Sequence, residues 1–201
     1  MVSKSDLKAV ATPAERAAAI EMALTSRGVA TVDDLAERVR LADELWLPER
    51  GARVVAKAWT DPGFRTRLLT NGKSAVAELG IELPAHHRHL VVLENSHIVH
   101  NVICCTLCSC TALTVIGLPP DWYKDLEYRA RVVRQSRTVL REMGLDLPAE
   151  TQVRVWDTTA DTRYMVLPVR PVGTDHWSES QLATLVTQDS MIGVARALEA
   201  K

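Results

Sequence analysis

All four cysteines of this 201-residue chain lie within seven residues, at Cys104, Cys105, Cys108 and Cys110. A disulfide framework spaces its cysteines along the chain, because a bridge stabilises a fold by closing a long loop. A bridge between the adjacent Cys104 and Cys105 would also be strained. The cluster therefore indicates metal or redox chemistry, and the rest of the chain must fold so that it holds this short loop.

Composition limits the class of protein and its partners. With 47% apolar and 24% charged residues, the chain is long enough for one sizeable domain with its own core. The 24 Lys and Arg residues nearly cancel the 25 Asp and Glu residues, so no net field attracts nucleic acid or an anionic membrane. No apolar run approaches the roughly 20 residues that span a bilayer, and no apolar signal segment follows Met1. We expect a cytoplasmic protein that binds neither nucleic acid nor a membrane.

Residues 13–84 are predicted to form a helical N-terminal segment, preceded by a mobile arm at residues 1–12 that carries no hydrophobic period. The first helix begins with Thr12 as N-cap, Pro13 at the first helical position and Glu15 completing a capping box. The second begins after Thr31. These two helices are expected to project and embrace a partner, or to pack as a small bundle on the same core.

Residues 85–201 show a different pattern. Short β-branched runs at 90–93 and 98–103 predict strands that lead into the cysteines. Helices are expected at 121–133, 136–144 and after Ser178, with two further strands at 152–156 and 164–169. The order predicts an α+β fold, in which the helical N-terminal segment is followed by an α/β sandwich-like catalytic domain that carries a Cys-x-x-Cys-x-Cys metal loop.

Three thiolates in one turn favour a soft metal such as zinc, copper(I), iron or cobalt. A structural zinc site needs four ligands, and only Cys104, His97 or His100 can complete one here. An iron–sulfur cluster usually takes a fourth cysteine elsewhere in the chain, which this sequence does not offer. Both kinds of site remain open, although neither fits the spacing well.

The spacing Cys108-Ser109-Cys110 points to a rarer kind of site. Sulfurs two residues apart flank one metal only if the backbone between them is drawn towards it, so the peptide nitrogens of Ser109 and Cys110 become candidate ligands. Together with the sulfurs of Cys108 and Cys110 they form a plane, Cys105 supplies an axial sulfur, and a sixth position stays open. Deprotonating an amide requires a strongly polarising ion, which favours trivalent cobalt or iron.

The chain resembles the nitrile hydratase α subunit, a family shared with the thiocyanate hydrolase γ subunit. The resemblance rests first on Cys105-Thr106-Leu107-Cys108-Ser109-Cys110 and then on flanking motifs, and it covers about residues 15–196. The motifs lie at residues 53–62, 101–110, 117–120, 122–124, 128–134, 162–168 and 191–193.

The resemblance implies a ligand set. Cys105, Cys108 and Cys110 match the three sulfur ligands, and Ser109 and Cys110 match the two backbone-amide ligands. In the family, the cysteine at Cys108 is oxidised to sulfinate and that at Cys110 to sulfenate, so that both become candidate catalytic groups. Thr106 matches the residue of cobalt-type members, where iron-type members carry serine. We therefore expect one Co(III) per chain, with Fe(III) as the alternative.

The implied reaction is the hydration of a nitrile to an amide, with the metal as Lewis acid. The nucleophile stays open between a water or hydroxide and the sulfenate oxygen of Cys110. The expected partners are one or more β subunits, whose arginines hold the oxidised sulfurs, and a metal-delivery or activator protein. Two alternatives remain: a thiocyanate hydrolase γ-like subunit, and a non-catalytic, metal-stapled binding subunit.

The sequence departs from the family pattern in three places. Cys104 stands where valine is usual and is expected to be a buried hydrophobe. Leu113 and Thr114 stand where many relatives carry tryptophan and proline. Their smaller side chains predict a wider pocket and a bulky substrate, such as a nucleoside or heteroaromatic nitrile. His176 is expected to be a surface change.

Other conspicuous side chains have simpler interpretations. Three aromatic residues are expected to pack in the core or an interface, namely Trp122, Tyr123 and Tyr128. Three histidines after Pro84 are expected to form a solvated linker, namely His86, His87 and His89. Arginines near the resemblance motifs are expected to be solvated, to face the partner or to support the metal loop, namely Arg129, Arg131 and Arg134. Arg163 has an even prospect of forming a structural ion pair.

Overall fold

The computed structural model describes residues 11–108 and 110–200, and the chain divides into one unit up to Glu44 and a second from Leu45. The first unit holds α1 (Pro13–Ser26) and α2 (Val32–Glu44). The predicted capping box is present, because Thr12 accepts a hydrogen bond from the Glu15 amide and Glu15 bonds back to Thr12. Neither helix contains a buried residue. Residues 1–10 of the predicted arm lie outside the described residues.

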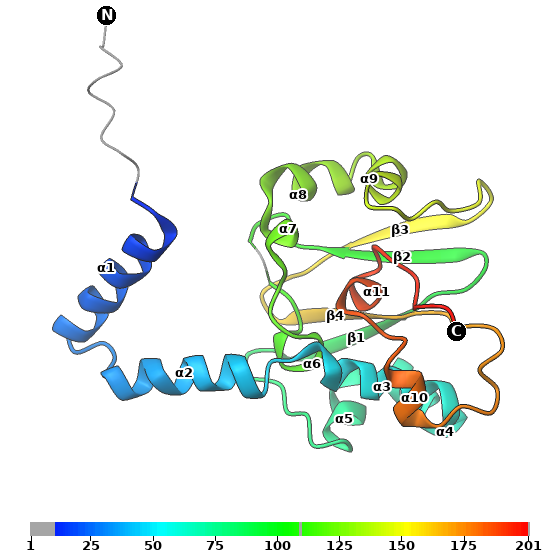
Figure 1. The fold of residues 1–201 in the computed structure, drawn as a ribbon, viewed down its shortest axis with the longest axis horizontal. Coiled ribbons are helices and arrows are strands. Elements are labelled where there is room, and N and C mark those ends of the chain that lie inside the picture. The colour runs from blue at the N-terminus through cyan, green and yellow to red at the C-terminus, as the bar shows by residue number, and fades with distance from the viewer. Residues whose placement is uncertain (1–10, 109, 201) are drawn as a thin grey trace, which may run out of the picture. The chain divides into compact units, whose positions relative to one another are not determined.

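The second unit is built on four strands that form two parallel pairs (Figure 1). Strand β1 (His89–Glu94) pairs with β4 (Thr162–Leu167), and β2 (Val99–Cys104) pairs with β3 (Gln152–Asp157). Each strand therefore pairs with a segment far away in the sequence rather than with its neighbour. The α+β class is confirmed, and parallel pairing places the ends of β2 and β3 side by side, with Cys104 opposite Asp157.

Helices surround these strands, and several of their bounds differ from the sequence expectation. The predicted helix at 121–133 is two helices, because Asp125 adopts an extended conformation (φ −60°, ψ 130°) and its side chain accepts a hydrogen bond from the Glu127 amide. The bounds are α3 (Pro48–Thr60), α4 (Pro62–Thr70), α5 (Gly72–Ala77), α6 (Leu113–Ile116), α7 (Asp121–Lys124), α8 (Leu126–Val132), α9 (Ser136–Glu142), α10 (Glu179–Ala183) and α11 (Gln188–Ile192).

One contiguous apolar core joins these helices to the strands. Strand β2 runs through it with five of its six residues buried, whereas β3 has no buried residue. The metal loop therefore follows a strand that is held on both faces. The division into a helical segment at 13–84 and a catalytic domain at 85–201 stays a prediction. No helix among the described residues is long and apolar enough to cross a membrane.

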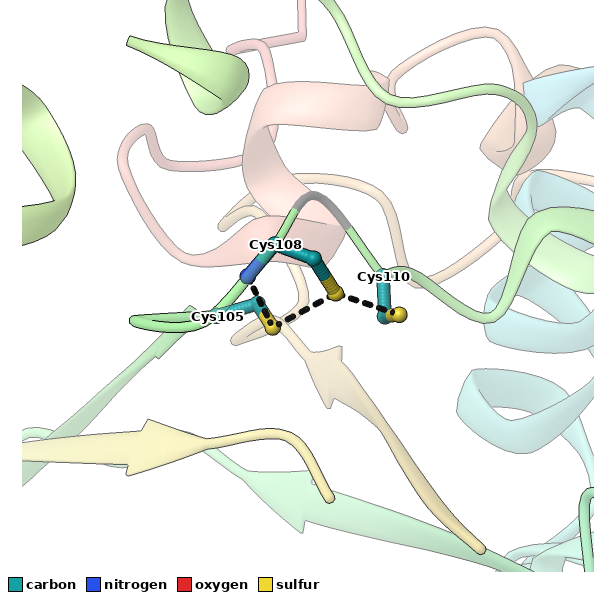
Figure 2. A group of neighbouring side chains, drawn as sticks. All are labelled: Cys105, Cys108 and Cys110. Atoms are coloured by element: carbon teal, nitrogen blue, oxygen red, sulfur yellow. Dashed lines mark hydrogen bonds between the residues drawn. The ribbon is translucent and has the colours of Figure 1, made fainter. Parts of the chain in front are cut away.

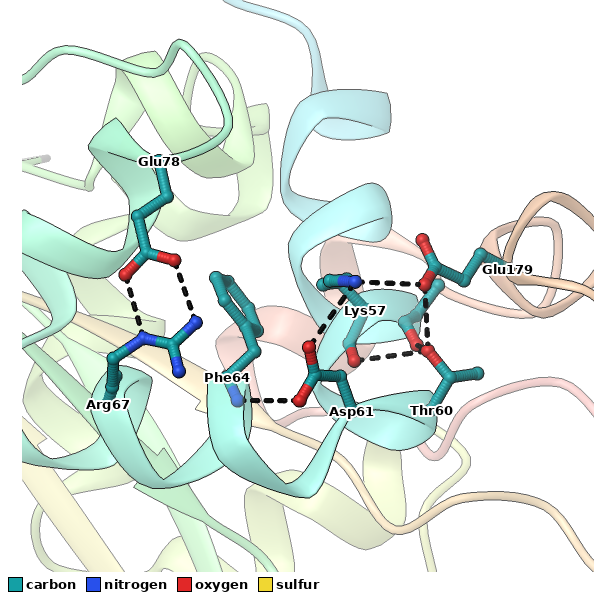
Figure 3. Close-up of polar contacts among 8 residues, drawn as sticks. Lys57, Thr60, Asp61, Phe64, Arg67, Glu78 and Glu179 are labelled. Carbon is teal, nitrogen blue, oxygen red and sulfur yellow. Dashed lines mark hydrogen bonds and ion pairs between the residues drawn. The ribbon is translucent and has the colours of Figure 1, made fainter.

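Surface polar contacts hold α3, α4 and α10 together (Figure 3). Asp61 ends α3 and caps α4, accepting a hydrogen bond from the Phe64 amide at 2.9 Å. Lys57 lies 3.4 Å from the Asp61 carboxylate and 3.5 Å from that of Glu179, which begins α10. The Thr60 hydroxyl donates to Glu179 Oε1 at 3.0 Å, the same oxygen that Lys57 contacts. Exposed pairs of this kind are screened by water and contribute little to stability.

Candidate metal centre

Three cysteine sulfurs converge directly after β2 (Figure 2). The Sγ atoms of Cys105 and Cys108 are 3.2 Å apart, and those of Cys108 and Cys110 are 2.7 Å apart. All three ligand atoms lie within 4.8 Å of one another. Cys104, by contrast, is fully buried in the core, and burial raises the pKa of its thiol to about 12. It behaves as the buried hydrophobe that was expected.

The backbone of the loop is turned towards the first sulfur. The Cys108 amide donates to Cys105 Sγ at 3.3 Å. Ser109 lies outside the described residues. An inward-facing amide beside converging sulfurs is what a ligand set of mixed sulfur and peptide nitrogen requires, so the donors that are described fit the metal that the spacing predicts.

The thiols of the loop differ in acidity. Burial raises the pKa of Cys105, but hydrogen bonds from the Thr158 hydroxyl, the Cys108 side chain and the Cys108 and Cys110 amides outweigh it and lower the pKa to about 7. Burial and the hydrogen bond with Cys108 raise the pKa of Cys110 to about 11, although the positive charge of Arg163 opposes this. The pKa of the Cys105 thiol therefore lies closer to neutral pH than that of the Cys110 thiol.

A fourth protein ligand is absent from the described residues, because no further His, Cys, Asp or Glu side chain joins the group of three cysteines. His100 uses both ring nitrogens elsewhere, on Asn95 and on the Gly193 carbonyl. His97 and His100 line a cavity of about 630 Å³ at the amino-terminal end of β2, whereas the cysteines follow its carboxyl end. The zinc tetrahedron considered from the sequence is therefore not assembled here.

Side chains from β3 and its exit surround the loop. Thr106 donates to Asp157 twice, from its amide to Oδ1 at 2.9 Å and from its hydroxyl to Oδ2 at 2.5 Å. Thr158 donates from its hydroxyl to the Cys110 carbonyl at 3.4 Å. Asp157 and Thr158 were assigned no role from the sequence. Their position directly after a strand was a signal, but only the pairing of β2 with β3 makes it readable.

Two tyrosines and an arginine from α7 and α8 complete the surroundings. The hydroxyl of Tyr123 donates to the Cys110 carbonyl at 3.1 Å, and that of Tyr128 donates to the Ile103 carbonyl at 3.1 Å. Both rings are buried, so the expectation of core packing is confirmed. Arg129 donates to the Thr106 carbonyl at 3.0 Å and so supports the loop. Arg131 instead pairs with carboxylates away from it, on Glu127 and Glu142.

Two of the expectations about isolated residues were wrong. His87 does not belong to a solvated linker, because it is 3% exposed, and burial lowers the pKa of its ring to about 4. Arg163 is 5% exposed and donates to the backbone carbonyls of Thr159 and Thr162. No carboxylate of the described residues forms an ion pair with it. His86, His89 and His176 are exposed, as expected.

The fold and the site together define an α+β metalloprotein whose candidate metal centre is a group of three cysteines directly after a buried strand. The comparison with known families agrees with this class. The family model described as "Nitrile hydratase, alpha chain" matches residues 11–195. The chain belongs to this family, and the resemblance found in the sequence is confirmed.

Individual relatives cover nearly the whole chain. The cobalt-containing nitrile hydratase subunit alpha of Pseudonocardia thermophila is 43% identical over 98% of this chain and 97% of its own. The structure of a double mutant of the Fe-type nitrile hydratase from Comamonas testosteroni Ni1 is 54% identical, with a TM-score of 0.90 over 95% of this chain and 96% of that one. A recombinant thiocyanate hydrolase comprising partially modified cobalt centres is 36% identical, with a TM-score of 0.80 over 96% of this chain and 95% of that one.

Proposed function

We propose that this chain is the metal-bearing α subunit of an enzyme that hydrates a nitrile to the corresponding amide. We further propose that Cys105, Cys108, Ser109 and Cys110 hold one trivalent cobalt ion. The observation that carries the proposal is the convergence of three sulfurs while the Cys108 amide points at Cys105 Sγ. Membership of the nitrile hydratase α-chain family supports the reaction.

Bound in this loop, a trivalent ion supplies a Lewis acid for polarising the substrate or a water molecule. The chain's own residues then have separate tasks. Cys105 serves as a plain thiolate, in keeping with its lowered pKa. Cys108, which is exposed, and Cys110, which is half-buried, are proposed as sulfinate and sulfenate. Oxygen atoms on these two sulfurs would be able to accept hydrogen bonds and to hold a proton beside the substrate.

Cobalt is favoured over iron by Thr106, which matches the cobalt-type residue, and by the cobalt-containing relative. The Fe-type relative of known structure keeps Fe(III) as the alternative. Metal analysis with intact-mass measurement tests both points on the chain purified with its partner. One cobalt per chain and the mass of three added oxygen atoms, two on Cys108 and one on Cys110, are expected. Stoichiometric zinc with unmodified thiols would contradict the proposal and favour a metal-stapled binding subunit.

Adjacent cysteines provide a matched control for the ligand set. Cys105→Ala removes a proposed ligand and is expected to abolish metal retention. Cys104→Ala removes a thiol one residue away that is buried in the core and lies outside the group of three sulfurs. It is expected to keep the metal, at the cost of a small cavity. Equal metal content in both variants would show that the three-sulfur site is not the metal centre.

A β subunit is proposed to form the missing wall of the site, as the α-chain family implies. The tip of the loop supports this, because Leu107 is 87% exposed between two cysteines. A partner chain that closes over the sulfurs would cover this side chain. An activator protein is proposed to deliver the metal. A cytoplasmic location is also proposed, since the clustering of all four cysteines argues against the disulfide framework typical of secreted proteins.

The substrate is proposed to be bulky. Leu113 begins α6 three residues after Cys110 and is half-buried, and Thr114 beside it is buried with a hydroxyl that has no partner among the described residues. Assays of small aliphatic against large heteroaromatic nitriles test the idea, and Leu113→Trp should shift the preference towards the small ones. Fastest turnover of the smallest nitrile by the unaltered chain would refute it. Preferred turnover of thiocyanate would favour the thiocyanate hydrolase alternative, which shares the fold.

A further inference from the structure

We infer that Asp157 is a positioning residue for the metal loop, and that it acts through the hydroxyl of Thr106. The inference rests on the proposed metal site but concerns residues that are not ligands. It assigns a purpose to position 106 that the cobalt-type resemblance leaves unexplained: the side-chain hydroxyl is required as a hydrogen-bond donor to Asp157, and its methyl group is not.

The geometry is that of a two-point clamp. Asp157 Oδ1 accepts from the Thr106 amide at 2.9 Å, while Oδ2 accepts from the Thr106 hydroxyl at 2.5 Å. Both oxygens of one carboxylate are thus bound to a single residue. Hydrogen bonds to an ionised acceptor are roughly twice as strong as neutral ones, and two of them fix orientation as well as distance.

The clamp is anchored to the rigid part of the fold. Asp157 is the last residue of β3 and lies opposite Cys104, the last residue of β2. The Thr158 amide adds a hydrogen bond to the Cys104 carbonyl at 3.0 Å. The carboxylate is therefore held at a fixed distance from the peptide that links Cys105 to Thr106. Its orientation follows from the sheet and not from the loop itself.

Thr106 is held on its other side as well. Arg129 donates to its carbonyl oxygen at 3.0 Å, so the amide, the hydroxyl and the carbonyl of one residue are all bound by groups outside the loop. Thr106 is exposed, and exposed loops are ordinarily mobile. With Thr106 fixed, the turn to Cys108 is fixed too, which keeps the Cys108 amide directed at Cys105 Sγ.

Asp157 has no competing role in the described residues. It forms no ion pair there, and its side-chain hydrogen bonds go to Thr106 alone. Asp161, four residues further on, is its natural comparison. Its carboxylate accepts hydrogen bonds from Thr159 and Thr162 and does not touch the metal loop. Both residues carry a carboxylate and lie four residues apart, but only the carboxylate of Asp157 contacts the metal loop.

Four variants of the full chain, purified with its partner subunit after growth on cobalt, test the inference. Asp157→Asn keeps the size but loses one acceptor, and Thr106→Val keeps the shape but loses the hydroxyl. Each is expected to release cobalt to a chelator about 10- to 100-fold faster and to alter the sulfur-to-cobalt charge-transfer absorption. Thr106→Ser keeps the hydroxyl and is expected to match the unaltered chain, as is the charge-matched control Asp161→Asn.

The double variant Asp157→Asn/Thr106→Val should lose no more cobalt than the more severe single variant. Both substitutions disrupt the same hydrogen bond, from the Thr106 hydroxyl to Asp157, so the second change has nothing further to remove there. Additive losses would overturn the inference, as would cobalt release and absorption in Asp157→Asn and Thr106→Val equal to those of the unaltered chain. A loss in Thr106→Ser as large as that in Thr106→Val would also overturn it, since the methyl group would then be the cause.

Failure of the proposed function is distinguishable. If the unaltered chain holds no cobalt, amide hydrogen exchange of the metal-free chain still tests the clamp. Exchange at the Thr106 amide should be faster in Asp157→Asn than in Asp161→Asn, because only the former weakens its acceptor. Equal exchange rates in these two variants would overturn the clamp independently of any metal.

Discussion

The ring of His100 donates from Nε2 to the carbonyl oxygen of Gly193 at 2.8 Å, which joins β2 to the end of α11. A carbonyl only accepts, so the proton is on Nε2 and Nδ1 is left to accept from the Asn95 side-chain amide at 3.2 Å. Asn95 Oδ1 in turn accepts from the Asn101 amide at 2.8 Å. The strand that delivers the cysteines is thus fixed by a buried network whose groups are all paired.

Gly193 is the most crowded glycine next to this network. It has φ +92°, and an added Cβ would lie 2.0 Å from the Asn101 carbonyl oxygen. We expect Gly193→Ala to lower the free energy of unfolding by about 3 kcal/mol or more, because backbone strain and a backbone clash act together. Chemical denaturation measures this. Gly80→Ala is the control, since Gly80 has φ +72° but open space around its Cβ position, and should cost about 1 kcal/mol. Equal costs would mean that the clash is relieved.

Asn101 satisfies several buried groups at once. Its Oδ1 accepts from Trp156 Nε1 at 2.9 Å, and its Nδ2 donates to the Glu94 carbonyl at 2.9 Å. Asn101→Leu leaves both groups unpaired, so we expect a loss of about 2 kcal/mol or more in the free energy of unfolding. Trp156→Phe removes the donor instead of stranding it. A smaller loss for the double variant than for the sum of the two single ones would confirm that the unpaired indole is part of the cost.

His87 predicts a pH dependence of stability. Burial first, and then the positive charge of Arg163, lowers its pKa from 6.5 to about 4. Between pH 4 and 6.5 the unfolded chain therefore binds more protons than the folded one, and stability falls as the pH falls through this window. One such group contributes a slope of at most about 1.4 kcal/mol per pH unit. Above pH 6.5 the contribution of His87 is constant.

Denaturation of the isolated chain at pH 4.5, 5.5 and 7.0 measures this slope. We expect His87→Gln to flatten it, since glutamine does not titrate. The exposed His176 is the control, and His176→Gln should leave the slope unchanged. A slope that survives in His87→Gln would show that another group is responsible.

Residues 45–201 are expected to fold without the first unit. Every residue of the apolar core lies at Ala52 or later, and α1 and α2 contain no buried residue. We expect a chain that starts at Leu45 to unfold cooperatively, with a free energy of unfolding within about 1 kcal/mol of the full chain. Thermal denaturation followed by circular dichroism checks this. Loss of the cooperative transition would show that the first unit is needed for folding.

Much of the local structure follows from the sequence. Capping residues such as Thr12 and Ser178 begin helices where they were expected, because a cap satisfies backbone groups of the same segment. The three thiols also lie within six residues of sequence, so one short turn can bring their sulfurs together. For these features the interacting groups are neighbours in the chain, and spacing alone carries the information.

Tertiary structure decided everything that depends on distant pairing. Strands β2 and β3 are about fifty residues apart in sequence, so nothing local announces that Asp157 and Thr158 stand beside Cys105 and Cys110. The burial of His87 and Arg163 likewise depends on which elements cover them. By itself the sequence predicted a candidate metal centre, because its proposed ligands are contiguous. Only the fold determined what orients that centre, because the groups around it come from elements that meet in space.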